Sequence, residues 1–350
     1  MINGYIDFRS DTVTHPTPAM RRAMAEAEVG DDVWGDDRTV KRLEQMSAER
    51  MGHEAGLFVA SGTMGNLVAL LTHCRRGEEV IAGDRSHIVT EEQGGMAALG
   101  GLMAHPISTR PDGRLDLEDI QGALRGDDPH WARTRLICIE NTQNQAGGIP
   151  LDPNYMRSVA ALARRNGLKL HVDGARIFNA AVALGVPADA LTRDADSVMF
   201  CLSKGLSAPI GSVLCGSKEF IAEAYRSRKV VGGAMRQVGV LAAAGIVALE
   251  TMVDRLAEDH ANARRLAEGL SDTPGFEVEL ERVRTNMVYF DLASDVSIDG
   301  QEVERRMASR GVRVAAVSPR RFRAVTHAWV TADEVDRALL AFRAVLTDRS

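Results

Sequence analysis

The chain has 350 residues, of which 45% are hydrophobic and 26% are charged, and its formal net charge is −6. This length allows one large domain or two modest ones with an ample core, and the acidic balance argues against a general nucleic-acid binder. No apolar run is long enough to span a bilayer, and the first residues lack the pattern of a signal peptide, so we expect a cytoplasmic protein.

Apolar, strand-like runs alternate with helical patterns over the first two thirds of the chain. The runs cover 55–60, 78–83, 133–140, 169–173, 197–203 and 211–216. A helical pattern follows the first run, and a second fills 153–167, with Asp152 as its cap and Gly167 as its stop. Strands that are apolar on both faces and separated by helices predict a mainly parallel sheet covered on two sides. The last two runs are too tightly linked for a crossover, which predicts one antiparallel strand.

The character of the sequence changes after Val231. Residues 235–270 are typical of one long helix that bridges two domains. Beyond it lie four short strand-like runs and helical stretches at about 299–310 and 332–346, a pattern that predicts a small α+β unit. The sequence therefore predicts a large domain over 1–245, including an N-terminal segment, and a small domain over 246–350.

Lys204 stands between two apolar runs in "DSVMFCLSKGLSAPIGSVLCG", residues 196–216. The chain has 42 basic residues but only five lysines, so arginine carries most of its positive charge. An amine can lose its proton and attack a carbonyl, whereas a guanidinium cannot. A lysine kept at the end of an apolar run therefore indicates covalent chemistry.

Other candidate residues follow strands of the same predicted sheet. Ligands of such sheets bind beyond the carboxyl ends of the strands. Asp173 ends the run in "HVDGAR", and Ser61, Gly62 and Thr63 form a small-residue turn between a strand and a helix, where backbone N–H groups can bind a phosphate. Each signal alone is more often a cap, a turn or a solvated side chain. Their joint order, with His87 between them, is what favours a site.

This combination fits pyridoxal 5′-phosphate (PLP), which needs a lysine for a Schiff base, an anion near its ring nitrogen and a phosphate cup. Lys204 is the candidate for the Schiff base, and Asp173 for the anion that keeps the ring nitrogen protonated. The turn at 61–63 is the candidate phosphate cup, and His87 is free to stack on the ring. The four cysteines lie in apolar segments without CxxC spacing, and no metal-ligand cluster is evident, so we expect buried thiols and no metal.

Several blocks resemble the low-specificity L-threonine aldolases, within the aspartate-aminotransferase-like, fold type I PLP enzymes. They are "IDFRSDTVTHPTPAM", "VGDDVWGDD", "FVASGTMGN", "DRSHI", "IENT", "HVDGARIFNA", "LSKGLSAPIGSVLCG", "GGAMRQ" and "RAVTH". The resemblance runs almost from end to end. It implies a large domain with a mainly parallel seven-stranded sheet, a small C-terminal α+β domain, and a homotetramer built from dimers that share their active sites.

The resemblance also implies residue roles. It gives the same roles as above to Lys204 (Schiff base), Asp173 (partner of the ring nitrogen) and His87 (stacking on the ring). It also adds Ser203 to Gly62 and Thr63 as a phosphate ligand. Three further residues resemble the clamp on the substrate carboxylate: Ser10, Arg176 and Arg323. Of these, Arg176 is also expected to contact the cofactor. Arg236 resembles an arginine supplied to the phosphate of a neighbouring subunit, and His130 a second active-site histidine.

The sequence departs from the family pattern at three positions that we expect near the substrate pocket. Gln143 stands where many relatives have histidine, Trp34 where tyrosine is common, and Arg38 where proline is common. These differences bear on the preferred substrate side chain and leave the cofactor unaffected.

The expected reaction is retro-aldol cleavage of L-threonine, L-allo-threonine and similar β-hydroxy-α-amino acids to glycine and an aldehyde. The base that takes the hydroxyl proton is left open between His87, His130 and a bound water. Another fold type I PLP activity, such as β-elimination, transamination or racemisation, would use the same lysine, aspartate and phosphate cup. A catalytically silent PLP-binding or nucleotide-binding protein is a third reading, against which the intact Lys204 and the carboxylate clamp count.

Overall fold

Seven short strands form the largest sheet of the computed structural model, which describes residues 1–346. In spatial order they are β2 (Ala55–Val59), β8 (Ser212–Gly216), β7 (Ser197–Cys201), β6 (Lys169–Asp173), β5 (Thr134–Glu140), β3 (Glu79–Gly83) and β4 (Met103–Ile107). Strand β8 is antiparallel to both of its neighbours, and the other pairs are parallel. The predicted antiparallel strand is therefore confirmed. The half-exposed edge strand β4, which contains Pro106, has no apolar pattern and was not predicted.

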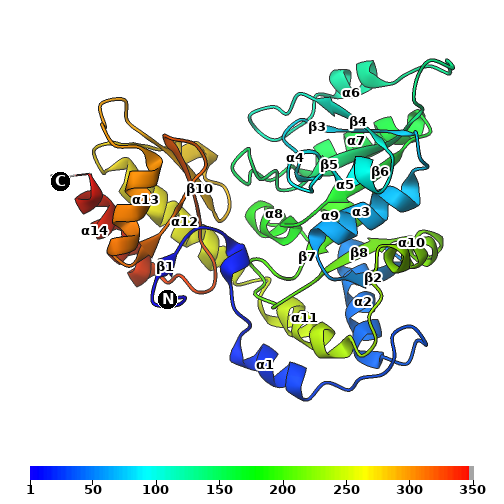
Figure 1. Cartoon of the computed structure of the whole chain (residues 1–350), viewed down its shortest axis with the longest axis horizontal. Helices are drawn as coiled ribbons and strands as arrows, with labels where there is room; N and C mark the ends of the chain where they lie inside the picture. The colour runs from blue at the N-terminus through cyan, green and yellow to red at the C-terminus, as the bar shows by residue number, and fades with distance from the viewer. Residues whose placement is uncertain (347–350) are drawn as a thin grey trace.

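Helices cover both faces of this sheet because its strands are apolar on both sides (Figure 1). Phe58 and Phe200 pack into one core, while their neighbours Leu57 and Met199 pack into another on the opposite face. The first core is covered by α1 (Pro18–Ala25), α2 (Arg38–Met51), α7 (Pro153–Arg165), α8 (Ile177–Leu184), α9 (Asp189–Thr192) and α11 (Gly239–Thr251). The opposite face is covered by α3 (Gly62–His73) and α10 (Lys218–Val230). The shorter elements are η1 (Asp11–Val13), α4 (His87–Thr90), α5 (Gly95–Ala98), α6 (Leu117–Ala123) and η2 (Leu280–Arg282).

Helix α7 shows how closely local signals set the boundaries. Asp152 accepts hydrogen bonds from the backbone N–H groups of Asn154 and Tyr155, at 2.9 and 3.1 Å. Gly167, just beyond the helix, has a φ of +67°, which favours glycine over other residues. The predicted cap and stop are both confirmed.

The single long helix predicted over 235–270 is wrong. The chain forms α11 and then α12 (Leu256–Ser271), with a break at 252–255. The two helices bury their apolar residues in different cores: α11 packs on α1 and α2, whereas α12 packs on the small domain. One straight helix cannot serve both surfaces.

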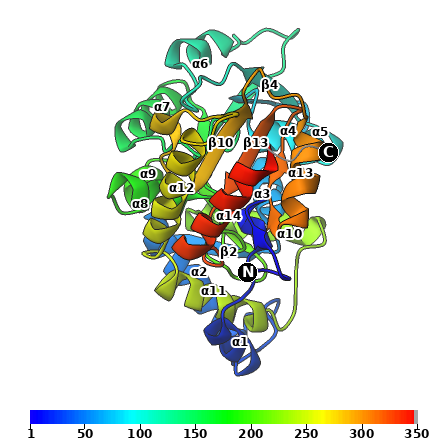
Figure 2. The same cartoon turned by 90° about the vertical axis from the view of Figure 1, so that its left-hand side faces the viewer.

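The small domain is an antiparallel sheet in the order β12 (Ala315–Ala316), β13 (Arg321–Val325), β10 (Met287–Leu292) and β9 (Phe276–Glu277). Helices α12, α13 (Gly300–Ser309) and α14 (Ala332–Val345) lie over one face of it (Figure 2). Phe290 and Phe322 stack within that core, with ring centroids 4.9 Å apart. Because side chains alternate along a strand, Tyr289, Arg321 and Arg323 belong to the other face, toward the large domain.

The N-terminal strand β1 (Ile6–Asp7) pairs with β11 (Val312–Arg313), and Ile6 and Phe8 lie in the small-domain core. The core of the large sheet continues to Leu256. We therefore propose that the domain division runs through the break between α11 and α12, and that the first strand belongs with the small domain. Among residues 1–346, no helix is both long and apolar enough to cross a membrane.

Candidate active site

A cavity of about 660 Å³ lies at the carboxyl ends of the parallel strands, and the free face of the small sheet contributes to its wall. This is the size and the place expected for a small-molecule site in an α/β fold. The sequence-predicted residues that line it are Ser10, Ser61, Gly62, Thr63, His87, Asp173, Arg176, Ser203, Lys204 and Arg323. His130 and Arg236 do not line it.

Three neighbouring strands each bring one charged residue to this cavity. Glu140 ends β5, Asp173 ends β6 directly opposite it, and Lys204 follows β7 by three residues. Since these strands are parallel and adjacent, their carboxyl ends meet at one edge of the sheet. No carboxylate within residues 1–346 forms an ion pair with the Lys204 amine, although the cavity is rich in acids. Thr14 donates a hydrogen bond of 3.0 Å to the Lys204 carbonyl, which tethers the loop to the N-terminal segment.

Helix α3 begins at the cavity. Ser61 caps it by accepting a hydrogen bond of 3.1 Å from the backbone N–H of Met64. Gly62 lies against β7 so closely that a Cβ there would stand 2.9 Å from Cys201 Sγ. The glycine therefore lets the helix start approach the strand ends. The first backbone N–H groups of α3 and its positive dipole end are of the kind that bind an anion.

A cluster of acids and one imidazole forms the floor of the cavity. His87 Nδ1 lies 2.8 Å from Glu92 Oε1, and its backbone N–H donates to Glu140 Oε2 at 2.8 Å. The hydrogen bond to Glu92 raises the pKa of His87. Burial raises the pKa of Glu92, and burial followed by repulsion from Asp173 raises the pKa of Glu140 to about 7. The region is thus suited to a cationic group of a ligand.

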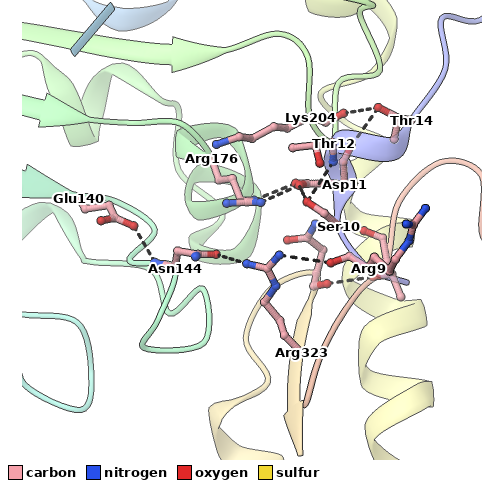
Figure 3. A network of polar contacts seen from close by, with 12 residues as sticks. Arg9, Ser10, Asp11, Thr12, Thr14, Glu140, Asn144, Arg176, Lys204 and Arg323 are labelled. Carbon is pink, nitrogen blue, oxygen red and sulfur yellow. Dashed lines mark hydrogen bonds and ion pairs between the residues drawn. The ribbon is translucent and has the colours of Figure 1, made fainter. Parts of the chain in front are cut away.

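Arg176 does not carry a free charge into the cavity. Its Nε and Nη2 donate to the two carboxylate oxygens of Asp11, at 2.8 and 2.6 Å, and both side chains are buried (Figure 3). Asp11 follows Ser10, whose hydroxyl caps the short helix η1. The guanidinium of Arg176 is therefore neutralised before any ligand arrives.

Arg323 is the contrasting case. It donates to uncharged oxygens, among them Asn144 Oδ1 and the Arg9 carbonyl, each at 3.2 Å (Figure 3). Its Nε is buried, and no acceptor for it lies in the described part of the chain. Arg320 instead points away, toward the carbonyls of Leu292, Ala293 and Val296. Arg323 thus leaves a positive charge and a buried donor for a ligand anion.

His130 and Arg236 lie outside the cavity of this chain. The His130 side chain is 84% exposed and pairs with Asp128 in the loop after α6. Arg236 is 57% exposed and pairs with Asp31. Neither can act at this pocket without a second subunit.

The three departures from the family pattern also lie outside the cavity of this chain. Gln143 is buried, but its amide donates to the Arg85 carbonyl at 2.7 Å and accepts from the backbone of Ala146. Trp34 is 80% exposed, and Arg38 pairs with Glu28 on the surface. Gln143 lies between two lining residues, Thr142 and Asn144, but both ends of its own amide are bound to backbone.

Sequence reasoning missed several lining residues: Asn66, Glu91, Glu92, Glu140, Asn144, Gln145, Tyr289 and Arg321. Glu140 ends a predicted strand, so the rule that identified Asp173 also points to it. Asn66 lies one helical turn after Gly62, on the face that reaches the same edge. Tyr289 and Arg321 come from the small sheet and have no local signal.

Comparisons with known proteins agree with this geometry. Residues 7–293 match the family model described as beta-eliminating lyase. The chain is 46% identical to low-specificity L-threonine aldolase 1 of Arabidopsis thaliana, over 99% of this chain and 98% of that one. It is 45% identical to the low specificity L-threonine aldolase of Escherichia coli strain K12, over 97% and 99%. The structure of Leishmania major threonine aldolase, 22% identical, superposes with a TM-score of 0.79 over 97% and 99% of the two chains.

Proposed function

Since the chain belongs to the beta-eliminating lyase family, among its low-specificity L-threonine aldolases, we propose that the cavity binds PLP and cleaves L-threonine, L-allo-threonine and related β-hydroxy-α-amino acids to glycine and an aldehyde. The protein is a carbon–carbon lyase with the aspartate-aminotransferase-like fold. The observation that carries the residue assignments is that Lys204, Asp173 and the start of α3 converge on one cavity.

The residues present fit this cofactor. Lys204 would hold it covalently through Nζ, and the N-terminus of α3, with Ser203, would hold its phosphate. Asp173 and the acids around it suit a protonated ring nitrogen, and Gly62 and Thr63 at the start of α3 line the cavity where the phosphate would lie. When bound, PLP supplies a carbonyl that condenses with amines and a ring that accepts the electron pair of the broken Cα–Cβ bond.

The chain's own residues then divide the remaining work. Arg323, with its unpartnered Nε, binds the substrate carboxylate and fixes the rotation about the N–Cα bond. Fixing that rotation decides which bond of Cα breaks. His87 is held through Nδ1 by Glu92, so Nε2 is the ring atom left to take the hydroxyl proton directly or through a water. His130 remains a candidate base only if it comes from a second subunit.

Product analysis with the wild-type protein tests this function. Adding PLP is expected to turn the protein yellow, and adding L-threonine or L-allo-threonine is expected to release glycine and acetaldehyde in equal amounts. Mainly oxo acids from threonine or serine would instead identify a β-eliminating lyase or an aminotransferase. A protein that stays colourless with PLP would refute the cofactor assignment.

Arg323→Ala is expected to raise KM for threonine by about ten- to a hundredfold, the range for a lost hydrogen bond to a charged group. It should also increase the share of oxo acid products, because the substrate is free to rotate about N–Cα. The matched control is Arg320→Ala, since Arg320 binds backbone carbonyls away from the cavity. An unchanged KM in Arg323→Ala, or an equal rise in both variants, would remove Arg323 from the clamp.

We propose that active sites are shared between subunits of a homotetramer built from dimers, in the cytoplasm. Arg236 is exposed and outside its own pocket, and Trp34 and Trp131 are among the large apolar residues that are exposed as well. These features suit a surface that another subunit covers. Arg236 would then reach the phosphate of the neighbouring site.

Mixing two inactive variants tests the sharing. An Arg236→Ala subunit and a Lys204→Ala subunit each lack a different group, so a mixed dimer would contain one site with both groups intact. We expect activity to return on mixing, and each mixed dimer should reach about half the activity of a wild-type dimer, because one of its two sites is intact. If subunit exchange is demonstrated by mass and activity does not return, Arg236 acts elsewhere.

A further inference from the structure

A line of buried polar side chains runs from Asp173 away from the cavity. Asn66 Nδ2 lies 2.8 Å from Asp173 Oδ2, and Asn66 Oδ1 lies 3.1 Å from His171 Nε2. The line continues from His171 Nδ1 to Ser197 Oγ at 2.8 Å, and from Ser197 Oγ to His73 Nε2 at 2.7 Å. Asn66, His171 and Ser197 are at most 1% exposed. Of the line beyond Asp173, only Asn66 contacts the cavity.

The two carboxyl groups at the Asp173 end of this line determine which atom donates in each of its hydrogen bonds. Asn66 Nδ2 also contacts Glu92 Oε1 at 2.8 Å, so the amide faces two carboxyl groups and must present its NH₂ to them. Asn66 Oδ1 then accepts a hydrogen bond, so His171 carries its proton on Nε2. Its Nδ1 accepts from the Ser197 hydroxyl.

Ser197 Oγ in turn accepts from His73 Nε2–H. The arrangement requires a neutral imidazole at His171, because its Nδ1 accepts and a protonated ring donates from both nitrogens. Burial lowers the pKa of His171 to about 3, which agrees with this requirement, and lowers that of His73 to about 4. All donors therefore point toward Asp173.

We propose that Asn66 is a positioning residue for Asp173 and that His73, Ser197 and His171 fix the orientation of its amide. This inference rests on the proposed function, because Asp173 is the residue that benefits. The backbone N–H of Ala175 holds the other oxygen, Oδ1, at 3.1 Å, so both carboxylate oxygens are tethered. A chain of hydrogen bonds with one direction polarises its members, which strengthens the last donor.

The same amide joins the two groups expected around the cofactor ring. Asn66 holds Asp173 directly and holds His87 through Glu92, whose Oε1 contacts both the amide and the imidazole. If the Asn66 amide turned over, its oxygen would face two carboxyl groups and both contacts would become repulsive. The hydrogen bond from His171 opposes this reversal of the amide. In the reversed amide, the Nε2–H of His171 would face the NH₂ of Asn66, and two donors would meet.

The proton positions can be measured without any turnover. NMR of protein labelled with ¹⁵N at histidine, with His73→Gln and His171→Gln used for assignment, is expected to show Nε2–H and unprotonated Nδ1 for both rings. The measurement works with or without added PLP. A proton on Nδ1 of His171 would reverse Asn66 and overturn the proposal, whatever the protein's activity.

Variants then separate positioning from simple packing. Asn66→Leu keeps the size of the side chain and is expected to lower kcat by about ten- to a hundredfold, with a smaller change in KM, and to alter the absorption spectrum of bound PLP across the neutral pH range. The matched control is Thr72→Val on the same helix, whose hydroxyl bonds Val68 and Ser227 outside the line. Equal changes in both variants would attribute the effect to the helix and overturn the positioning role.

Ser197 gives the sharpest contrast, because it contacts neither the cavity nor Asp173. Ser197→Ala is expected to shift the spectrum of bound PLP and to lower kcat, both by less than Asn66→Leu does. Ser197→Thr, which keeps the hydroxyl, is expected to have the spectrum and the kcat of the wild type. Ser47→Ala, at a buried serine in α2, should leave both unchanged. A wild-type spectrum and kcat in Ser197→Ala would overturn the proposal. Absence of threonine cleavage by the wild type would refute the function alone, since the proton positions are read independently.

Discussion

Lys204→Ala is expected to abolish threonine cleavage and the visible absorption of bound PLP, while the far-UV circular dichroism and thermal unfolding stay close to those of the wild type. No carboxylate in residues 1–346 pairs with this amine, so the substitution breaks no ion pair. The fold should therefore survive. The loss of turnover should reach the background of the assay, because Lys204 is the one lysine among the described residues that line this cavity.

Two further variants sharpen this prediction. Lys204→Arg should be as inactive as Lys204→Ala, because a guanidinium keeps its proton and cannot attack a carbonyl. Lys229→Ala, at an exposed lysine of α10, should keep full activity and colour. If Lys204→Ala or Lys204→Arg retained near-normal turnover, another residue would have to hold the cofactor.

Asp173→Asn is expected to lower kcat by about a hundred- to a thousandfold, the range observed when one charge-stabilising group is removed from an active site. The asparagine lacks the anion that favours a protonated ring nitrogen. It also places an NH₂ where both carboxylate oxygens now accept hydrogen bonds, from Asn66 and from the Ala175 backbone. PLP should still bind, since the phosphate site and Lys204 are intact.

The control for this second prediction lies at the opposite end of the strands of the same sheet. Asp196, just before β7, accepts hydrogen bonds from Lys169 and the backbone of Leu170, far along the strand from the cavity. Asp196→Asn should affect stability more than kcat. The measurements are the single-turnover rate and the PLP affinity of both variants. A single-turnover rate of Asp173→Asn within a few-fold of the wild-type rate would show that Asp173 does not stabilise the protonated ring nitrogen.

Local signals in the sequence determined the framework of the site. Apolar runs predicted six of the strands of the large sheet, and caps such as Asp152 predicted where a helix starts. Asp173 and Lys204 could be found because a residue at the carboxyl end of a parallel strand lies at the ligand-binding edge whatever the rest of the chain does. The family blocks added Arg176, Arg323 and Ser10, all of which line the cavity.

The tertiary structure alone decided how charge is distributed among those residues. Arg176 and Arg323 look alike in the sequence, but Asp11, 165 residues away, neutralises the first, while the second meets only uncharged oxygens. The role of Asn66 could not be inferred from the sequence, because its amide lies beside Asp173 only once α3 packs against β6. The break between α11 and α12 has the same origin, because two cores compete for one apolar helix pattern. Periodicity and capping report contacts a few residues apart, whereas the charge balance and proton direction at a buried site depend on partners that only folding brings together.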